Sequence, residues 1–260
     1  MFVNLKFDMT PDAELLALGA GWKRAAERPV LLLASTREQG GESEEDLLLR
    51  ALPHAVAERA LLVWVPRHPQ RFDAVAQRLA VHGLAVARRS QSMPDKQTTV
   101  WLGDTLGEMA AYYAMADAAF IGGSLLPLGG QNLIEACACG CPVVLGPSQF
   151  NFATAAEQAV ASGAAVQVQT AGQVWQALAR WLDDFAARNM AADRARTFAD
   201  DHGRERCGAA AVRRRRHGEA YSGPRKIPGP GQRSLDPAGK AGGGQRQTDR
   251  MAKKAVWVRC

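Results

Sequence analysis

The segment 120–136 contains residue types that could bind a nucleotide phosphate. Two glycine pairs, Gly122-Gly123 and Gly129-Gly130, lie between a short apolar run and a helix-forming stretch. Glycine permits positive φ angles and lets a ligand approach the backbone closely. The N–H groups of such a loop, together with the N-terminus of the next helix, would form an anion site suited to a phosphate.

Two polar side chains follow the second glycine pair. Asn132 can cap the next helix, and Glu135 lies three residues further on, as in a capping box. Glu135, one turn into the helix, could also accept hydrogen bonds from ribose hydroxyls. The same pattern describes an ordinary strand-to-helix turn without a ligand, so the loop alone leaves both interpretations open.

The rest of the sequence alternates apolar runs with helix-like segments. We expect buried strands at residues 29–35, 61–65, 85–87, 98–102, 118–121, 142–146 and 164–168. Helices are expected at about residues 11–26, 43–60, 72–82, 106–116, 132–139, from 150 onward, 171–185 and 187–200. This alternation predicts an α/β fold, a Rossmann-like parallel sheet with helices on both faces.

Polar and glycine-rich clusters follow the predicted strands at their carboxyl ends. The carboxyl ends of parallel strands meet at one edge of a sheet, and ligands bind there at the topological switch point. The clusters are residues 35–37, 66–71, 103–108, 122–135 and 146–152. Their convergence on one edge favours a ligand site over a simple turn.

The charge is unevenly distributed along the 260 residues, which carry a formal net charge of +6. Residues 203–260 contain 15 of the 32 Lys and Arg residues and 4 of the 26 Asp and Glu residues. The remainder therefore has 17 basic and 22 acidic residues, and the net charge of the whole chain does not indicate nucleic-acid binding. We expect a folded domain at 1–202, entered by a linker-like first segment, and a basic tail at 203–260.

The tail 203–260 has no hydrophobic periodicity and contains runs such as Arg213–Arg216 and Gly242–Gly244. This composition predicts disorder, because it cannot bury enough apolar surface. The tail could be a basic arm for nucleic acid or anionic lipid. It could instead be an out-of-frame product of a GC-rich gene, and we favour that interpretation.

Cysteine usage and hydropathy indicate neither a metal site nor a membrane span. Cys137, Cys139 and Cys141 alternate without a nearby His, which is a poor zinc pattern and predicts small buried residues in a reducing cytoplasm. We expect no metal and no cofactor. No signal peptide is visible, and no apolar run approaches the roughly 20 residues of a membrane span, so any membrane contact is expected to be peripheral.

Seven motifs resemble, in order, the C-terminal half of bacterial 3-deoxy-D-manno-octulosonic acid (Kdo) transferases. The resemblance covers about residues 3–202, and the motifs are residues 4–8, 34–38, 66–72, 103–108, 122–125, 129–135 and 146–152. The family implies a two-domain GT-B glycosyltransferase that is metal-independent. Its C-terminal domain binds the donor CMP-Kdo, and its N-terminal domain binds the lipid A precursor and carries a glutamate general base. Members build the lipopolysaccharide inner core at the cytoplasmic face of the inner membrane.

The resemblance also implies a set of nucleotide-binding residues. Arg67 would offer a planar fork to the donor phosphate or sugar carboxylate, Gly107 and Gly123 would let the nucleotide approach the backbone, and Glu135 would bind ribose. Arg67 could instead form a surface salt bridge and Glu108 could simply cap a helix, and we expect His68 to be structural rather than catalytic. The full predicted set is Pro66, Arg67, Leu106, Gly107, Glu108, Gly123, Ser124, Asn132, Leu133, Ile134 and Glu135.

We therefore predict the donor-binding half of a Kdo transferase, with no catalytic base in this chain and no activity alone. Gln131 replaces a frequent His of the family, and Ser148-Gln149 replaces a frequent His-Thr pair. The acceptor site and the base are expected in an N-terminal domain that this sequence lacks. One alternative is a GT-B enzyme with a UDP-sugar donor. Another is a non-enzymatic module whose tail binds nucleic acid with steep salt dependence, although no specific nucleic acid is expected.

Overall fold

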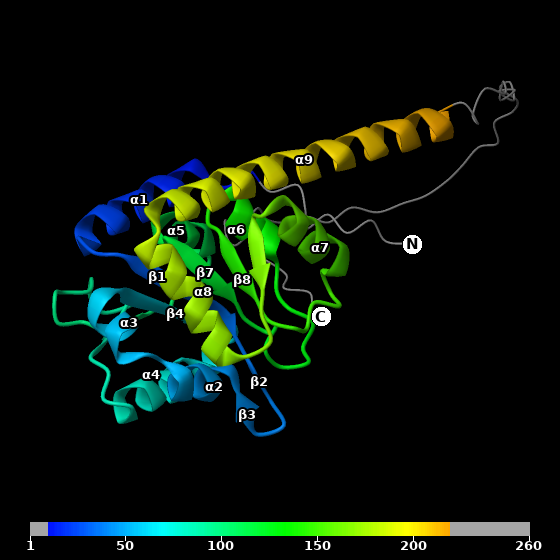
Figure 1. The fold of residues 1–260 in the computed structure, drawn as a ribbon. Helices are drawn as coiled ribbons and strands as arrows, with labels where there is room; N and C mark the ends of the chain where they lie inside the picture. The colour runs from blue at the N-terminus through cyan, green and yellow to red at the C-terminus, as the bar shows by residue number, and fades with distance from the viewer. Residues whose placement is uncertain (1–9, 219–260) are drawn as a thin grey trace, which may run out of the picture. The chain divides into compact units, whose positions relative to one another are not determined.

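The computed structural model describes the backbone of residues 10–218 and the side chains of residues 10–202. The chain divides into two units, Met1–Arg216 and His217–Cys260, and the fold below is that of the first unit. A seven-stranded parallel sheet lies at its centre, in the order β5-β6-β4-β1-β7-β8-β9 (Figure 1). The linker predicted at the start of the chain and the tail from residue 219 lie outside the described residues.

All seven predicted strands are present, which confirms the parallel α/β fold. They are β1 (Val30–Thr36), β4 (Leu61–Pro66), β5 (Val86–Arg88), β6 (Val100–Leu102), β7 (Ala118–Ile121), β8 (Val143–Leu145) and β9 (Ala165–Gln167). β1 pairs with β4 on one side and with β7 on the other. Because the chain leaves β1 for one half of the sheet and returns at β7 to build the other half, the switch point lies between β1 and β7.

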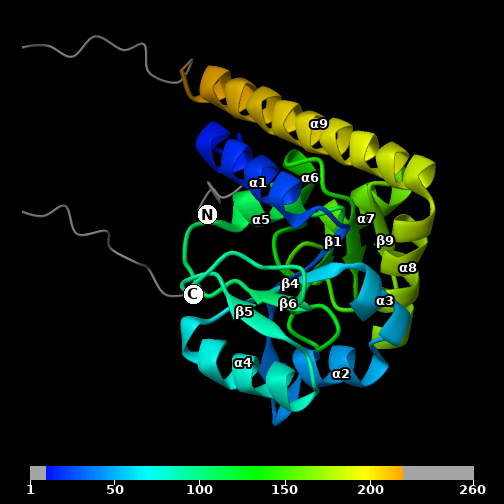
Figure 2. The same cartoon turned by 90° about the vertical axis from the view of Figure 1, so that its left-hand side faces the viewer.

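Helices cover both faces of the sheet (Figure 2). Within the central strand, Leu32 faces one core and Leu31 and Leu33 face the other, as side-chain alternation along a strand requires. The first core includes residues of α1 (Ala13–Ala26), α5 (Met109–Met115), α6 (Leu133–Ala138) and α7 (Ala153–Ser162). The second includes residues of α2 (Glu44–Ala51), α3 (His54–Arg59), α4 (Phe72–Val81) and α8 (Ala171–Asp183). The last helix, α9 (Phe185–Gly218), contributes to both.

The helix predicted over residues 43–60 is wrong in one respect, because it is broken into α2 and α3. Pro53 cannot donate a helical hydrogen bond, and it forces the preceding residue, Leu52, into an extended conformation with ψ 116°. α5 begins at Met109, three residues later than predicted. α9 continues to Gly218, beyond the predicted helix end at residue 200. The predicted domain boundary between residues 202 and 203 falls inside α9 and stays a prediction.

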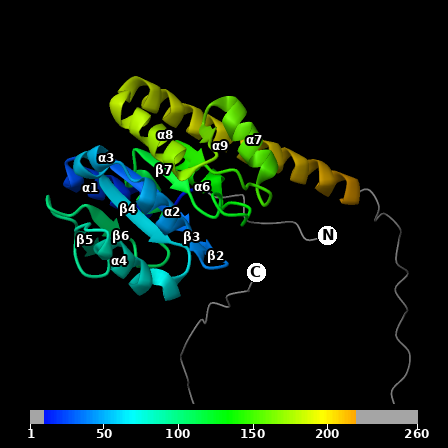
Figure 3. The ribbon, with the colours of Figure 1, turned by 60° about the horizontal axis from the view of Figure 1, so that its bottom comes forward.

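A short hairpin follows β1 and was not predicted. β2 (Glu38–Gln39) pairs with β3 (Glu42–Ser43), and the hairpin projects from the body of the domain beside α2 (Figure 3). Gly40 and Gly41 form its turn with φ angles of 61° and 85°. A two-residue turn of this kind needs positive φ at both positions, which glycine supplies without strain.

Two contacts attach the first and last described helices to the domain. Trp22 of α1 packs against Trp101 and Tyr112, with ring centroids 5.1 and 5.3 Å away. Asp117 forms ion pairs with Lys23 of α1 and with Arg188 of α9, and it accepts a hydrogen bond from the Val30 amide of β1. No helix within residues 10–218 combines the length and the apolar character needed to cross a membrane.

Candidate nucleotide-binding site

The candidate site lies where β1, β4 and β7 end, at the predicted edge of the sheet. Gly122 follows β7, and its amide donates to the Ala34 carbonyl oxygen at 2.7 Å. A Cβ atom on Gly122 would lie 2.5 Å from the Ser35 carbonyl oxygen and 2.7 Å from the Thr36 Cα atom. Only glycine therefore fits at this position, and it brings the loop after β7 directly against the end of β1.

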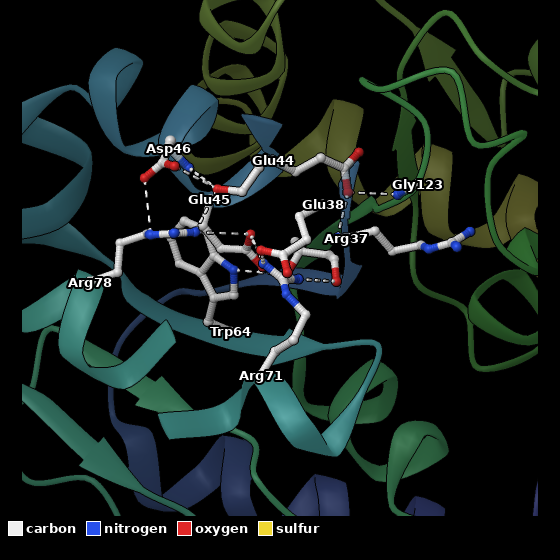
Figure 4. Close-up of polar contacts among 11 residues, drawn as sticks. Arg37, Glu38, Glu44, Glu45, Asp46, Trp64, Arg71, Arg78 and Gly123 are labelled. Atoms are coloured by element: carbon white, nitrogen blue, oxygen red, sulfur yellow. Dashed lines mark hydrogen bonds and ion pairs between the residues drawn. The ribbon is translucent and has the colours of Figure 1, made fainter. Parts of the chain in front are cut away.

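A buried carboxylate from α2 holds the loop after β7 (Figure 4). Glu44 is fully buried. Its Oε2 atom accepts from the Arg37 and Gly123 amides at 2.9 and 2.7 Å, and its Oε1 atom accepts from the Ser124 and Leu125 amides at 3.0 and 2.9 Å. Burial raises the pKa of the Glu44 carboxyl, and the four amide hydrogen bonds oppose that effect.

We call these four hydrogen bonds the Glu44 clamp. They occupy backbone amides that were expected to bind an anion. The N–H groups of residues 123–125 were predicted to face a phosphate, but they are donated to the protein's own carboxylate. Sequence reasoning missed this contact because Glu44 lies in a charged stretch that indicates only a helix N-terminus. In this conformation, these three amides are not available to a ligand.

Ser124 joins the two loops that follow β7 and β8. It is fully buried. Its hydroxyl donates to the Ile121 carbonyl oxygen and accepts from the Gly146 amide, the latter at 2.9 Å. Its carbonyl oxygen accepts from the Ser148 amide at 2.9 Å. The structure therefore places Ser124 as a residue that positions the loops, and its predicted contact with nucleotide stays a prediction.

Arg67 and Glu135 come together from two different elements. Pro66, which is buried, ends β4 and is followed by the exposed Arg67, whose amide donates to the Thr36 carbonyl oxygen at 3.0 Å. The Arg67 Nε atom donates to the Gln131 Oε1 atom at 3.1 Å. Burial raises the pKa of Glu135, and the positive charge of Arg67 opposes that shift. The two residues thus lie within electrostatic reach of each other without forming an ion pair among the described residues.

The start of α6 separates site residues from core residues. Asn132 caps the helix, as predicted, by accepting from the Ile134 amide at 3.0 Å. Leu133 and Ile134 are 0% and 6% exposed and pack in the hydrophobic core, so their side chains face away from a ligand. A capping box would also require the Glu135 carboxylate to accept from the Asn132 amide. Within the described part of the chain it does not, so this carboxylate is available to a ligand.

A second group of predicted residues lies at the start of α5. Leu106 is 67% exposed, and a Cβ atom on Gly107 would meet no other atom within 4 Å. Glu108 occupies the N-cap position but makes no capping hydrogen bond. Its carboxylate instead accepts from Arg89 Nη2 at 2.9 Å and from the Thr105 hydroxyl. Glu108 therefore lies at the N-terminus of α5, as the capping alternative expected, but without a capping hydrogen bond, and Arg89 orients its carboxylate.

Below the loop, a second buried carboxylate pairs with an arginine. Glu45 is fully buried, and its two oxygens accept from Arg71 Nη1 and Nη2 at 3.0 and 2.6 Å. Arg71 also donates to the Thr36 carbonyl oxygen at 3.1 Å. This bidentate pair fixes the end of β1 from beneath (Figure 4).

The charges of three arginines act on His68, which follows Arg67 in the chain. Burial lowers the pKa of His68 below its usual value, and three positive charges act in the same direction. These charges belong to Arg37, Arg67 and Arg71. Arg37 was not in the predicted set, although it lies in the polar cluster that follows β1 and could have been found there. His68 makes no side-chain hydrogen bond among the described residues, so it lacks the structural bond expected of it.

The cysteines behave as small core residues. Cys137 and Cys141 are buried free thiols, as predicted, and Cys139 is partly buried. Burial raises the pKa of the Cys137 thiol to about 12. No group of three or more His, Cys, Asp or Glu side chains within residues 10–202 is placed to hold a metal ion.

Known proteins resemble the chain in sequence. No protein-family model matches it. The 3-deoxy-D-manno-octulosonic acid transferase of Bordetella pertussis is 45% identical over 206 residues, which cover 76% of this chain and 47% of that protein. The chain thus spans about half the length of this curated relative.

Solved structures resemble the fold. The C-terminal CMP-Kdo binding domain of WaaA from Acinetobacter baumannii matches with a TM-score of 0.67 and 30% identity, over 72% of this chain and 98% of that domain. HepE of Anabaena in complex with UDP and glucose matches with a TM-score of 0.52 and 13% identity, over 77% of this chain and 53% of that protein. At that identity the second match concerns the fold alone.

Proposed function

Because the chain belongs to the Kdo transferase family, we propose that its folded domain is the donor-binding half of such an enzyme and binds CMP-Kdo. The Bordetella pertussis relative is about twice as long as the region matched. We therefore assign to this chain the binding of the donor, and we assign no general base among its described residues.

The observation that carries the proposal is the position of an exposed Arg67, bonded to Gln131 just before α6, near Glu135 of that helix at the switch point of the sheet. Arg67 is exposed and has a neutral amide, Gln131, as its side-chain partner in the described residues. An unpaired guanidinium suits a phosphate or a carboxylate. Glu135 is half-buried with a carboxylate not used in capping, which suits the hydroxyl groups of a ribose. A Cβ atom on Gly107 would meet no other atom within 4 Å, so a nucleotide could approach the backbone there.

In the whole enzyme, we propose the following transfer. A carboxylate base of the part that precedes the matched region in the relatives takes the proton of a sugar hydroxyl on the lipid A precursor. The hydroxyl oxygen forms a bond to the anomeric carbon of Kdo, and the bond from that carbon to the phosphate oxygen breaks. CMP leaves with the electron pair, and Arg67 stabilises the negative charge that develops on its phosphate.

The acceptor is a lipid, so we propose that the whole enzyme acts at a membrane surface. The place consistent with a cytoplasmic nucleotide donor and a lipid A precursor is the cytoplasmic face of the inner membrane, with peripheral attachment. We propose no metal, cofactor or specific nucleic acid for this activity.

The proposal is tested by calorimetric titration of the 260-residue chain with CMP and with UMP. We expect binding of CMP in preference to UMP. Glu135→Ala is expected to weaken CMP binding by about tenfold or more, because it removes a charged hydrogen-bond acceptor. Glu157→Ala, which changes an exposed carboxylate on α7, is the matched control and should leave the affinity unchanged.

Two outcomes would contradict the proposal. A preference for UMP would favour a UDP-sugar donor. A chain that is folded by circular dichroism and binds neither nucleotide would contradict donor binding by this chain.

A further inference from the structure

Two arginines beside the candidate site have no acidic partner. Within residues 10–202 neither Arg37 nor Arg67 forms an ion pair, whereas the neighbouring Arg71 pairs with Glu38 and Glu45. The buried Nε atom of Arg37 has no hydrogen-bond partner in that part of the chain. The acidic residues near this edge thus neutralise Arg71 and leave two guanidinium groups unpaired.

The stem of Arg37 and the hydrogen-bond partner of Arg67 lie beside the same glycine, Gly123. A Cβ atom on Gly123 would lie 3.3 Å from the Arg37 Cδ atom and 3.2 Å from the Gln131 Nε2 atom. Gln131 in turn accepts from the Arg67 Nε atom at 3.1 Å. Figure 4 shows the Arg37 side chain running past Gly123 and away from the Glu45–Arg71 pair. The lowered pKa of His68 has both arginines among its causes, which agrees with their proximity.

The backbone amides that follow β7 do not supply a substitute for these side chains. The amides of residues 123–125 are donated to Glu44, so the loop has no free nest of N–H groups at that point. Neighbouring like charges repel one another, and a bound anion relieves that repulsion. The arrangement therefore favours a ligand with negative charge over a neutral sugar.

We propose that Arg37 is a second anion-binding residue of this site and that it shares an anionic group of the donor with Arg67. The inference rests on the proposed function, because the donor CMP-Kdo supplies two such groups, a phosphate and a sugar carboxylate. Both present paired oxygens that match the planar fork of a guanidinium group.

The test is titration of the 260-residue chain carrying Arg37→Gln with CMP and with freshly prepared CMP-Kdo. We expect a loss of affinity of about tenfold or more, because a charge-assisted hydrogen bond is removed. A loss of affinity for both ligands would place the phosphate between the two arginines. A loss of affinity for CMP-Kdo alone would place the sugar carboxylate there. Unchanged affinity for both ligands would overturn the assignment of Arg37 and leave the proposed function intact.

Two further variants complete the experiment. Arg50→Gln changes an exposed arginine at the end of α2 and should bind both ligands as the unmodified chain does. Arg37→Lys keeps the charge and the aliphatic stem above Gly123 if Arg37→Gln fails to fold. It should bind less tightly than the unmodified chain, because an ammonium group lacks the fork. Wild-type affinity in that variant would also overturn the proposal, and absence of CMP binding by the unmodified chain would overturn the proposed function itself.

Discussion

At the scale of single residues, Glu44 and Glu45 show two ways to bury a carboxylate. Both are fully buried at the start of α2. Glu45 is neutralised by a bidentate arginine, whereas Glu44 is held by four backbone amides and by no cation among the described residues. The four hydrogen bonds of Glu44 connect α2 with the turn after β1 and with the loop after β7. Because they involve no arginine side chain, they leave the nearby arginines available to a ligand.

The clamp predicts the effect of Glu44→Gln. A glutamine keeps one acceptor oxygen but turns an NH₂ group toward two of the four amides, which lose their acceptor. Each buried unsatisfied donor costs about 1 to 3 kcal/mol, so we expect a loss of about 2 to 5 kcal/mol in the free energy of unfolding, measured by urea denaturation. Glu42→Gln, on the exposed hairpin, should change it by less than about 0.5 kcal/mol. Equal stability of the two variants would contradict the clamp.

Sequence reasoning found the site residues that belong to local motifs and missed those fixed by distant contacts. Asn132 was recognised as a cap because capping depends on residues within one turn. Glu44 was missed because three of its four partners lie 79 to 81 positions away in the chain. Ser124 was predicted to contact the nucleotide because its motif resembles the family, and sequence could not show that its side chain turns inward to Gly146.

At the scale of elements, the contact of α1 with α5 depends on one glycine. A Cβ atom on Gly19 would overlap with the Ala111 carbonyl oxygen and lie 2.8 Å from the Ala114 Cβ atom. We expect Gly19→Ala to lower the free energy of unfolding by about 1 to 3 kcal/mol, measured by thermal denaturation, because two backbones would have to separate.

The same helix provides the control. A Cβ atom on Gly21 would meet only a flexible arginine atom at 3.9 Å. Gly21→Ala should therefore stabilise the domain by about 0.5 to 1 kcal/mol, because alanine is the better helix former. If both substitutions change stability in the same direction, the close approach of α1 and α5 is wrong.

The strands were predictable because a parallel sheet covered on both faces requires continuous apolar runs, and residues 30–34 form such a run. The hairpin of β2 and β3 was missed, although its Gly40-Gly41 pair is a recognised turn signal. The break in the helix predicted over residues 43–60 could have been anticipated from Pro53. These errors share one cause, because hydrophobic periodicity was given more weight than the residues that interrupt it.

At the scale of the whole domain, Asp117 connects the first helix, the central strand and the last helix. Its side chain is 10% exposed, and that of Arg188 is 16% exposed. Asp117→Asn keeps an acceptor for the Val30 amide but removes the charge that holds Lys23 and Arg188. We expect a loss of about 1 to 3 kcal/mol and faster amide hydrogen exchange in α9 between residues 185 and 200.

The matched control for this junction lies on α9 itself. Asp193 pairs with Arg196 across one turn, with side chains 78% and 57% exposed. Asp193→Asn should have little effect, because exposed ion pairs contribute about 0 to 1 kcal/mol. Unchanged hydrogen exchange of α9 in the Asp117→Asn variant would show that other contacts hold this helix.

The packing of α1 also has a consequence for synthesis of the chain. Trp22 packs on Trp101 and Tyr112, which the ribosome adds long after α1 has left the exit tunnel. Until those rings emerge, the apolar side of α1 has no surface of its own domain to cover it. We therefore expect α1 to dock on its domain only after α5 has been synthesised.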